Sequence, residues 1–185
     1  MTQVPGAQNF RASGTAYDRF MGRYSRASAP LFADAAGLGG PGSGATAPVT
    51  SALDVGCGPG ALTEVLVARL GAGAVGACDP SESFLAAVHE RCPGVDVRPG
   101  SAEALPFADA AFDAALAQLV LHFVHEPDRA GAELRRVVRP GGVVAACSWD
   151  FAEQMQLLRS FWDAALAVRP DAPDEAQVLR FGRRG

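Results

Sequence analysis

The chain has 185 residues and a formal net charge of −4, with 49% hydrophobic and 19% charged residues. This composition predicts one globular domain that buries roughly 70% of the surface its unfolded form exposes. The basic residues form no cluster, which argues against nucleic acid as the main partner. No apolar run approaches the ~20 residues of a membrane span, and the N-terminus lacks the layout of a signal peptide.

The cysteines are spaced too far apart to form a C-x-x-C pair, and no histidine cluster accompanies them. A metal site or a disulfide framework is therefore not expected. We expect buried free thiols in a reducing compartment, and hence a cytoplasmic protein.

Residues 1–48 are predicted to hold N-terminal helices and a linker. Apolar residues recur at three- and four-residue spacing and give one stripe of a helix, at Tyr17, Phe20, Met21 and Tyr24. Pro30 fits the first turn of a second helix over residues 31–36. The glycines of residues 37–44 predict a flexible surface linker.

Residues 49–150 alternate between strand and helix patterns, and residues 151–185 follow as a helix and a tail. The predicted strands are residues 52–55, 74–78, 95–98, 112–119 and 143–148. The predicted helices are residues 61–70, a helix that Pro80 and Ser81 open, and residues 127–138 and 153–168. This alternation predicts an α/β fold, a Rossmann-like doubly wound parallel sheet of about five strands with helices on both faces.

The turn after the first predicted strand contains Gly56, Gly58 and Gly60. Glycines there let a ligand approach the backbone, and the following helix offers free N–H groups. Asp79 ends the second predicted strand, where a carboxylate can bind ribose hydroxyls. These features predict an adenosine-containing cofactor, and by themselves they leave NAD open.

The order of motifs between Leu53 and Trp149 resembles class I S-adenosylmethionine-dependent methyltransferases. The motifs are Leu53–Gly60, Asp79, Gly100–Phe107, Phe112-Asp113 with Gln118–His122, and Arg139–Gly142. The chain most resembles the ubiquinone/menaquinone-biosynthesis-like group, methyltransferase type 11, whose N-terminal helix is similar to Tyr17–Ser25. The resemblance implies S-adenosyl-L-methionine as cofactor and a small molecule as methyl acceptor.

The resemblance also implies a role for each matching residue. Asp54 and the loop glycines would hold the methionine portion, Asp79 the ribose hydroxyls, and Gln118 would lie near the methionine amino group. Many relatives carry Asp where this chain has Ser101, and a serine hydroxyl makes a weaker hydrogen bond to the adenine amino group. The full predicted cofactor set is Asp54, Gly56, Cys57, Gly58, Gly60, Asp79, Pro80, Ser101, Ala102, Glu103 and Gln118, of which Ala102 and Glu103 would flank the adenine.

Methyl transfer from a sulfonium depends mainly on positioning, so the sequence need not contain a diagnostic catalytic residue. His122, at the carboxyl end of the fourth predicted strand, is the candidate general base, with His125 behind it. Both could equally be polar loop residues. Arg23 and Tyr24 could close over the cofactor as a lid, or Tyr24 could simply pack on the sheet.

The region after Trp149 shows no strand pattern. Relatives continue with antiparallel strands, so the sheet is expected to lack them and the chain to be C-terminally truncated. Residues 143–148 would then form an uncovered edge, and Phe161, Trp162 and Leu166 would form an apolar patch, which favours self-association. Three functions follow from the sequence: a small-molecule methyltransferase, a non-catalytic S-adenosylmethionine-binding remnant, and an NAD-binding oxidoreductase domain.

Overall fold

A five-stranded parallel sheet organises the protein, whose computed structural model describes residues 18–38, 48–151 and 155–174. The strands lie in the order β3-β2-β1-β4-β5, and each pairs in parallel with its neighbours. This confirms the predicted doubly wound α/β fold. The strands are β1 (Ala52–Val55), β2 (Val75–Asp79), β3 (Asp96–Pro99), β4 (Phe112–Gln118) and β5 (Val138–Cys147).

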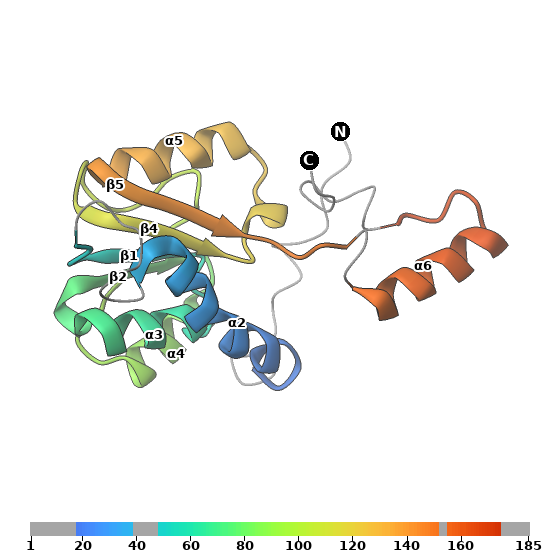
Figure 1. Ribbon diagram of the computed structural model, residues 1–185, viewed down its shortest axis with the longest axis horizontal. Coiled ribbons are helices and arrows are strands. Elements are labelled where there is room, and N and C mark those ends of the chain that lie inside the picture. Colours follow the sequence, from blue (N-terminus) through green and yellow to red (C-terminus); the bar gives the residue numbers. More distant parts are fainter. Residues whose placement is uncertain (1–17, 39–47, 152–154, 175–185) are drawn as a thin grey trace.

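Helices cover both faces of the sheet (Figure 1). One face carries α2 (Arg23–Ala33), α3 (Ala61–Leu70) and α4 (Glu82–Arg91), and the other carries α5 (Pro127–Val137). Single helical turns accompany them, η2 (Asp18–Gly22), η3 (Asp34–Leu38), η4 (Ala72–Ala74) and η5 (Leu121–Phe123). The inner strands β1 and β2 consist of buried residues alone, as expected where both faces of a parallel sheet are covered.

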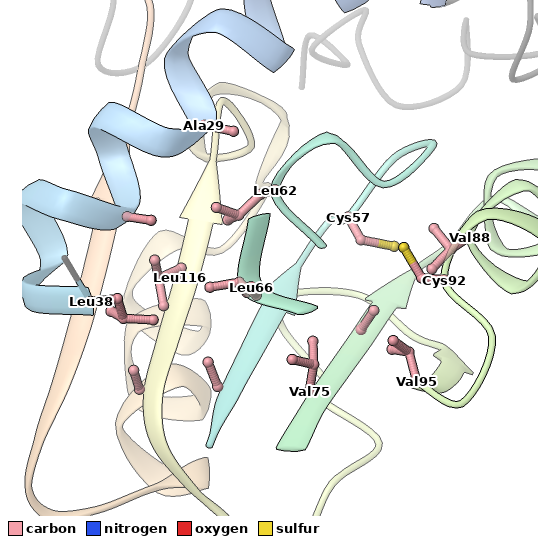
Figure 2. Packing of buried hydrophobic residues seen from close by; sticks show 14 of the residues in the cluster. Ala29, Leu38, Cys57, Leu62, Leu66, Val75, Val88, Cys92, Val95 and Leu116 are labelled. Atoms are coloured by element: carbon pink, nitrogen blue, oxygen red, sulfur yellow. The ribbon is translucent and has the colours of Figure 1, made fainter. Parts of the chain in front are cut away.

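The side chains of β1 and β4 alternate between two hydrophobic clusters. Ala52 and Leu116 face the cluster beneath α2, α3 and α4, which also contains Leu62 and Leu66 of α3 (Figure 2). Leu53 of β1 faces the opposite cluster, beneath α5. The period-two alternation therefore anchors the sheet to both helical layers at once.

The N-terminal helix differs from the prediction at Pro30. Pro30 lies inside α2 instead of opening a second helix. Arg69 of α3 holds the end of α2 and η3 against α3, because its Nη2 donates to the Pro30 carbonyl at 3.1 Å and its Nη1 donates to the Leu38 carbonyl at 3.0 Å. Leu38, predicted to lie in a flexible linker, is instead buried in η3. Tyr17 and residues 39–44 of that linker lie outside the described residues.

β5 begins earlier than predicted, at Val138. Its pairing with β4 jumps from Phe112–Val138 to Ala114–Val143, so residues 139–142 bulge out opposite Asp113. Gly142 allows this bulge, because a Cβ there would lie 2.3 Å from the Asp113 carbonyl oxygen. The predicted turn at Arg139–Gly142 is thus a bulge within a longer strand.

The other predicted boundaries shift by one or two residues, and β1 and α3 match them. α6 spans Gln156–Val168, and residues 153–154 of its predicted start lie outside the described part. α6 extends away from the sheet and none of its residues is buried (Figure 1). Phe161 is 59% exposed, and Val144 on the edge strand β5 is 46% exposed. Of the predicted apolar patch, Phe161 is thus exposed, whereas Trp162 and Leu166 are partly buried.

Candidate functional site

The turn between β1 and α3 is held against the end of β2. The N–H groups of Gly56 and Cys57 both donate to the Cys78 carbonyl, at 2.8 and 3.0 Å. Gly58 and Gly60 adopt left-handed φ angles of 51° and 98°, which glycine permits without strain. A Cβ at Gly58 would meet no atom within 4 Å, so this side of the loop is open.

Asp79 lies at the carboxyl end of β2 and fastens the loop. Its Oδ2 accepts from the Gly58 N–H at 2.9 Å, and its Oδ1 accepts from the Ser81 N–H at 2.8 Å. Burial raises the pKa of Asp79, and these two N–H groups oppose that rise. Each carboxylate oxygen keeps a further lone pair, which suits a vicinal diol such as that of a ribose.

Asp54 on β1 lies beneath the loop and is 1% exposed. Its Oδ2 accepts from the Thr63 hydroxyl at 2.6 Å. Burial raises the pKa of Asp54 from 3.8 to about 7, despite the hydrogen bonds from Thr63, and the nearby charge of Asp79 adds to the rise. A positively charged group close to Asp54 would stabilise the ionised form of this buried carboxyl group.

A cleft opens at the carboxyl ends of β2 and β4, next to the loop. It is open to solvent at its mouth and is lined by residues of the glycine loop and of the segments that follow β2 and β4. Five of the predicted cofactor residues line it, namely Gly56, Gly58, Asp79, Pro80 and Gln118. The cleft therefore lies where ligands bind in folds of this kind, at the carboxyl edge of the parallel sheet.

Other predicted residues lie behind or beside this lining. Asp54 and Gly60 are buried under the loop, and the Cys57 side chain belongs to the hydrophobic cluster. Burial raises the pKa of the Cys57 thiol, so the side chain is an inert core group. Cys57 thus contributes to the loop through its backbone, whose N–H donates to the Cys78 carbonyl of β2.

The predicted adenine loop lies beyond the cleft lining. Ser101 pairs with Ala104 in a short bridge, and Ala102 is buried. Glu103 Oε1 accepts from the His125 N–H at 2.9 Å. Burial acts to raise the pKa of Glu103, but this bond and other hydrogen bonds lower it overall. The Glu103 carboxylate thus fastens two loops together.

Gln118 connects the cleft to the N-terminal helix. Its Nε2 donates to the Ser25 carbonyl at 2.9 Å and to the Ser28 hydroxyl at 2.8 Å, both on α2. Tyr24 of α2 is exposed and packs edge-on against Trp149, with ring centroids 6.2 Å apart. α2 is therefore docked at the open end of the sheet.

His122 is 1% exposed and does not line the cleft. Its ring packs edge-on against Phe123 and Phe151, at centroid distances of 5.5 and 5.4 Å. Neither ring nitrogen has a hydrogen-bond partner within the described parts of the chain. Burial lowers the pKa of His122, which keeps the imidazole neutral.

The sequence did not predict several residues that line the cleft, namely Ser81, Phe84, Leu119, Val120 and Phe123. Their only signal was that they follow the carboxyl ends of β2 and β4. Leu119 adopts a left-handed φ of 61°, a strained conformation for a residue with a side chain. No pattern in the sequence marks that strain.

The described residues contain neither a membrane-spanning helix nor a cluster of metal ligands. No helix there is long and apolar enough to cross a membrane. No group of three or more His, Cys, Asp and Glu side chains in residues 18–38, 48–151 and 155–174 could hold a metal ion.

Comparisons with known proteins identify the family. The family profile described as a methyltransferase domain matches residues 53–146, just over half of the chain. The chain therefore belongs to the methyltransferase-domain family, in which the fold and the cleft are those of class I S-adenosylmethionine-dependent enzymes. This family membership favours S-adenosylmethionine over NAD.

Individual relatives agree with this assignment. The chain is 38% identical over 137 residues to an uncharacterized methyltransferase of Mycolicibacterium vanbaalenii, covering 72% of this chain and 51% of that protein. It is 43% identical over 100 residues to a ubiquinone biosynthesis O-methyltransferase of Agrobacterium fabrum, covering 52% of this chain and 39% of that protein. The chain thus spans about half the length of these curated relatives, or less.

A solved structure shares the fold. A SAM-dependent methyltransferase from Thermotoga maritima superposes with a TM-score of 0.55 at 24% identity, covering 91% of this chain and 73% of that one. At this identity the likeness shows the fold alone.

Proposed function

We propose that this chain is the cofactor-binding part of an S-adenosylmethionine-dependent methyltransferase that acts on a small-molecule acceptor. The cleft beside the glycine loop carries the proposal, because it brings Gly58, Asp79 and Gln118 together at the carboxyl edge of the sheet. The Agrobacterium fabrum relative is named as a ubiquinone biosynthesis O-methyltransferase, which supports a small acceptor. When bound, the cofactor supplies a methyl group activated on a sulfonium.

The residues of the loop would bind and orient that cofactor. Asp79 would accept hydrogen bonds from the ribose hydroxyls while keeping its bonds to the Gly58 and Ser81 N–H groups. Asp54 would place negative charge beneath the methionine amino group. Ser101, Ala102 and Glu103 would flank the adenine, as the resemblance implies.

The apolar residues of the cleft would exclude water. Phe84, Val120 and Phe123 are among the residues that line it. Positioning the acceptor in line with the departing sulfur accounts for most of the acceleration such a reaction needs. The role of His122 as a general base stays a prediction, and it requires Phe123 or Phe151 to move so that a ring nitrogen can reach the acceptor.

Calorimetric binding of S-adenosylhomocysteine tests the site. Asp79→Asn should weaken binding by about 10-fold or more, because a charged acceptor is replaced by a neutral one. Asp96→Asn is the matched control, since Asp96 is an exposed carboxylate that pairs with Arg98 on β3. Unchanged affinity in Asp79→Asn would remove Asp79 from the site, and stabilisation of the wild type by NAD in thermal-shift measurements would favour the oxidoreductase.

A second candidate is a chain that binds the cofactor without transferring its methyl group. The lack of any buried residue in α6 favours it, because that helix encloses nothing over the described residues. A methyl-transfer assay with a panel of small acceptors separates the two. If the wild type methylates any acceptor faster than Asp79→Asn does, the chain is an active methyltransferase.

We also propose that copies of the chain associate through the edge of β5. Val144 on that edge and Phe161 on α6 are both exposed apolar residues. Light scattering after size exclusion should show a dimer or larger species, and Val144→Lys should shift it toward monomer. A wild-type monomer at all concentrations would contradict this. Fractionation of cells would test the predicted cytoplasmic location, and protein in another fraction would overturn it.

A further inference from the structure

Arg91, the last residue of α4, joins the cofactor loop to the N-terminal helical segment. Its Nη1 donates to the Pro59 carbonyl at 2.6 Å. Its Nη2 forms an ion pair with Asp18 Oδ2 in η2. A guanidinium is planar and rigid, so one group that binds at both ends fixes the two partners relative to each other.

The Pro59 carbonyl belongs to the peptide group that enters α3. Its neighbour, the Gly60 N–H, donates to the Cys57 carbonyl at 3.0 Å. The preceding Gly58 N–H donates to Asp79. Because glycines flank Pro59 with left-handed φ angles, the loop backbone has little steric restraint of its own. The hydrogen bond from Arg91 to the Pro59 carbonyl therefore restricts a loop backbone that its own glycines leave free to move.

Asp18, the second partner of Arg91, also depends on this arginine. Asp18 Oδ2 also contacts Arg26 Nη2 at 3.3 Å, and Arg26 Nη1 pairs with Glu64 of α3 at 2.6 Å. Asp18 Oδ1 is buried and has no partner within the described residues. Removing Arg91 would leave a largely buried carboxylate with a single long contact, which disfavours docking of η2 and α2.

We propose that Arg91 is a positioning residue that couples docking of residues 18–33 to the conformation of the cofactor loop. The inference rests on the proposed function of that loop as the S-adenosylmethionine site. A docked N-terminal segment holds the guanidinium in place for Pro59. By linkage, a loop ordered by cofactor holds the same guanidinium in place for Asp18, so each event favours the other.

A double-mutant cycle on S-adenosylhomocysteine affinity tests the coupling. Asp18→Asn and Arg91→Met should each weaken binding by about 10-fold, and the double variant should be no weaker than the worse single variant. Arg91→Lys keeps the positive charge but loses the two-pronged guanidinium that reaches both partners. It should therefore bind S-adenosylhomocysteine more tightly than Arg91→Met and more weakly than the wild type. Asp171→Asn is the matched control, because its exposed ion pair with Arg169 touches neither the loop nor residues 18–33, and it should bind like the wild type.

Trp149 fluorescence supplies an independent readout, since its indole packs against Tyr24 of α2. The chain has two tryptophans, so Trp162→Phe leaves Trp149 as the sole emitter. Adding S-adenosylhomocysteine should change its emission in that background, and adding Arg91→Met should abolish the change even at saturating ligand.

The outcomes separate this inference from the proposed function. Multiplicative losses in the double variant, wild-type affinity in both single variants, or a fluorescence change that survives Arg91→Met would overturn the coupling alone. A wild-type chain that does not bind S-adenosylhomocysteine would overturn the proposed function and the coupling with it.

Discussion

Replacing Asp54 with asparagine removes a carboxyl group that the folded protein holds in an unfavourable place. Asp54 is 1% exposed, and its Oδ2 accepts from the Thr63 hydroxyl at 2.6 Å. In Asp54→Asn the new side chain has nearly the same size, and its amide oxygen can still accept from Thr63. The substitution therefore removes the ionisable group while leaving the size and packing of the side chain nearly unchanged.

The size of the effect follows from the pKa of Asp54, which burial raises from 3.8 to about 7. At about 1.4 kcal/mol for each pH unit, ionisation costs the folded protein about 4 kcal/mol. The unfolded chain ionises Asp54 near pH 4 and the folded chain only near pH 7. The free energy of unfolding of the wild type therefore falls as pH rises from about 4 to about 7, and it levels off above that.

Urea unfolding of the ligand-free protein at pH 5 and pH 8 measures this cost. The free energy of unfolding of Asp54→Asn minus that of the wild type should increase by about 2–3 kcal/mol between the two pH values. Groups that do not interact with Asp54 titrate alike in both proteins and cancel in this difference. A difference that does not change with pH would refute the assignment of a raised pKa to Asp54.

Three further outcomes test the loop, the core and the buried histidine. Gly60 has a φ of +98°, and a Cβ there would lie 3.2 Å from Val88, so Gly60→Ala should lower the free energy of unfolding by about 1–2 kcal/mol. Gly131 lies in open space on α5, so Gly131→Ala should not lower it. Equal effects of the two variants would contradict the loop geometry. Leu116→Ala should lose about 2–5 kcal/mol in urea unfolding, and a loss below ~1 kcal/mol would contradict its burial. Because burial lowers the pKa of His122, the wild type should lose stability relative to His122→Phe as pH falls below 6.5; parallel pH profiles would contradict this.

Local patterns in the sequence determined the elements and the loop. The alternation of apolar residues predicted β1 and α3 with the bounds the structure has. The glycines after β1 and the acidic Asp79 marked the cofactor edge, because the carboxyl ends of parallel strands meet there. These signals are local, so neighbouring residues suffice to produce them.

Contacts between distant residues decided the rest. Pro30 lies inside α2, and Arg69 from another helix binds its carbonyl, a contact that no pattern around residue 30 indicates. His122 is enclosed by Phe151, which lies far along the chain, and no pattern around residue 122 indicates that. The link from Asp18 through Arg91 to Pro59 likewise joins three separate segments. The sequence by itself determined where the cofactor edge forms, and only the tertiary structure decided which side chains hold it in place, because those contacts depend on packing between elements far apart in the chain.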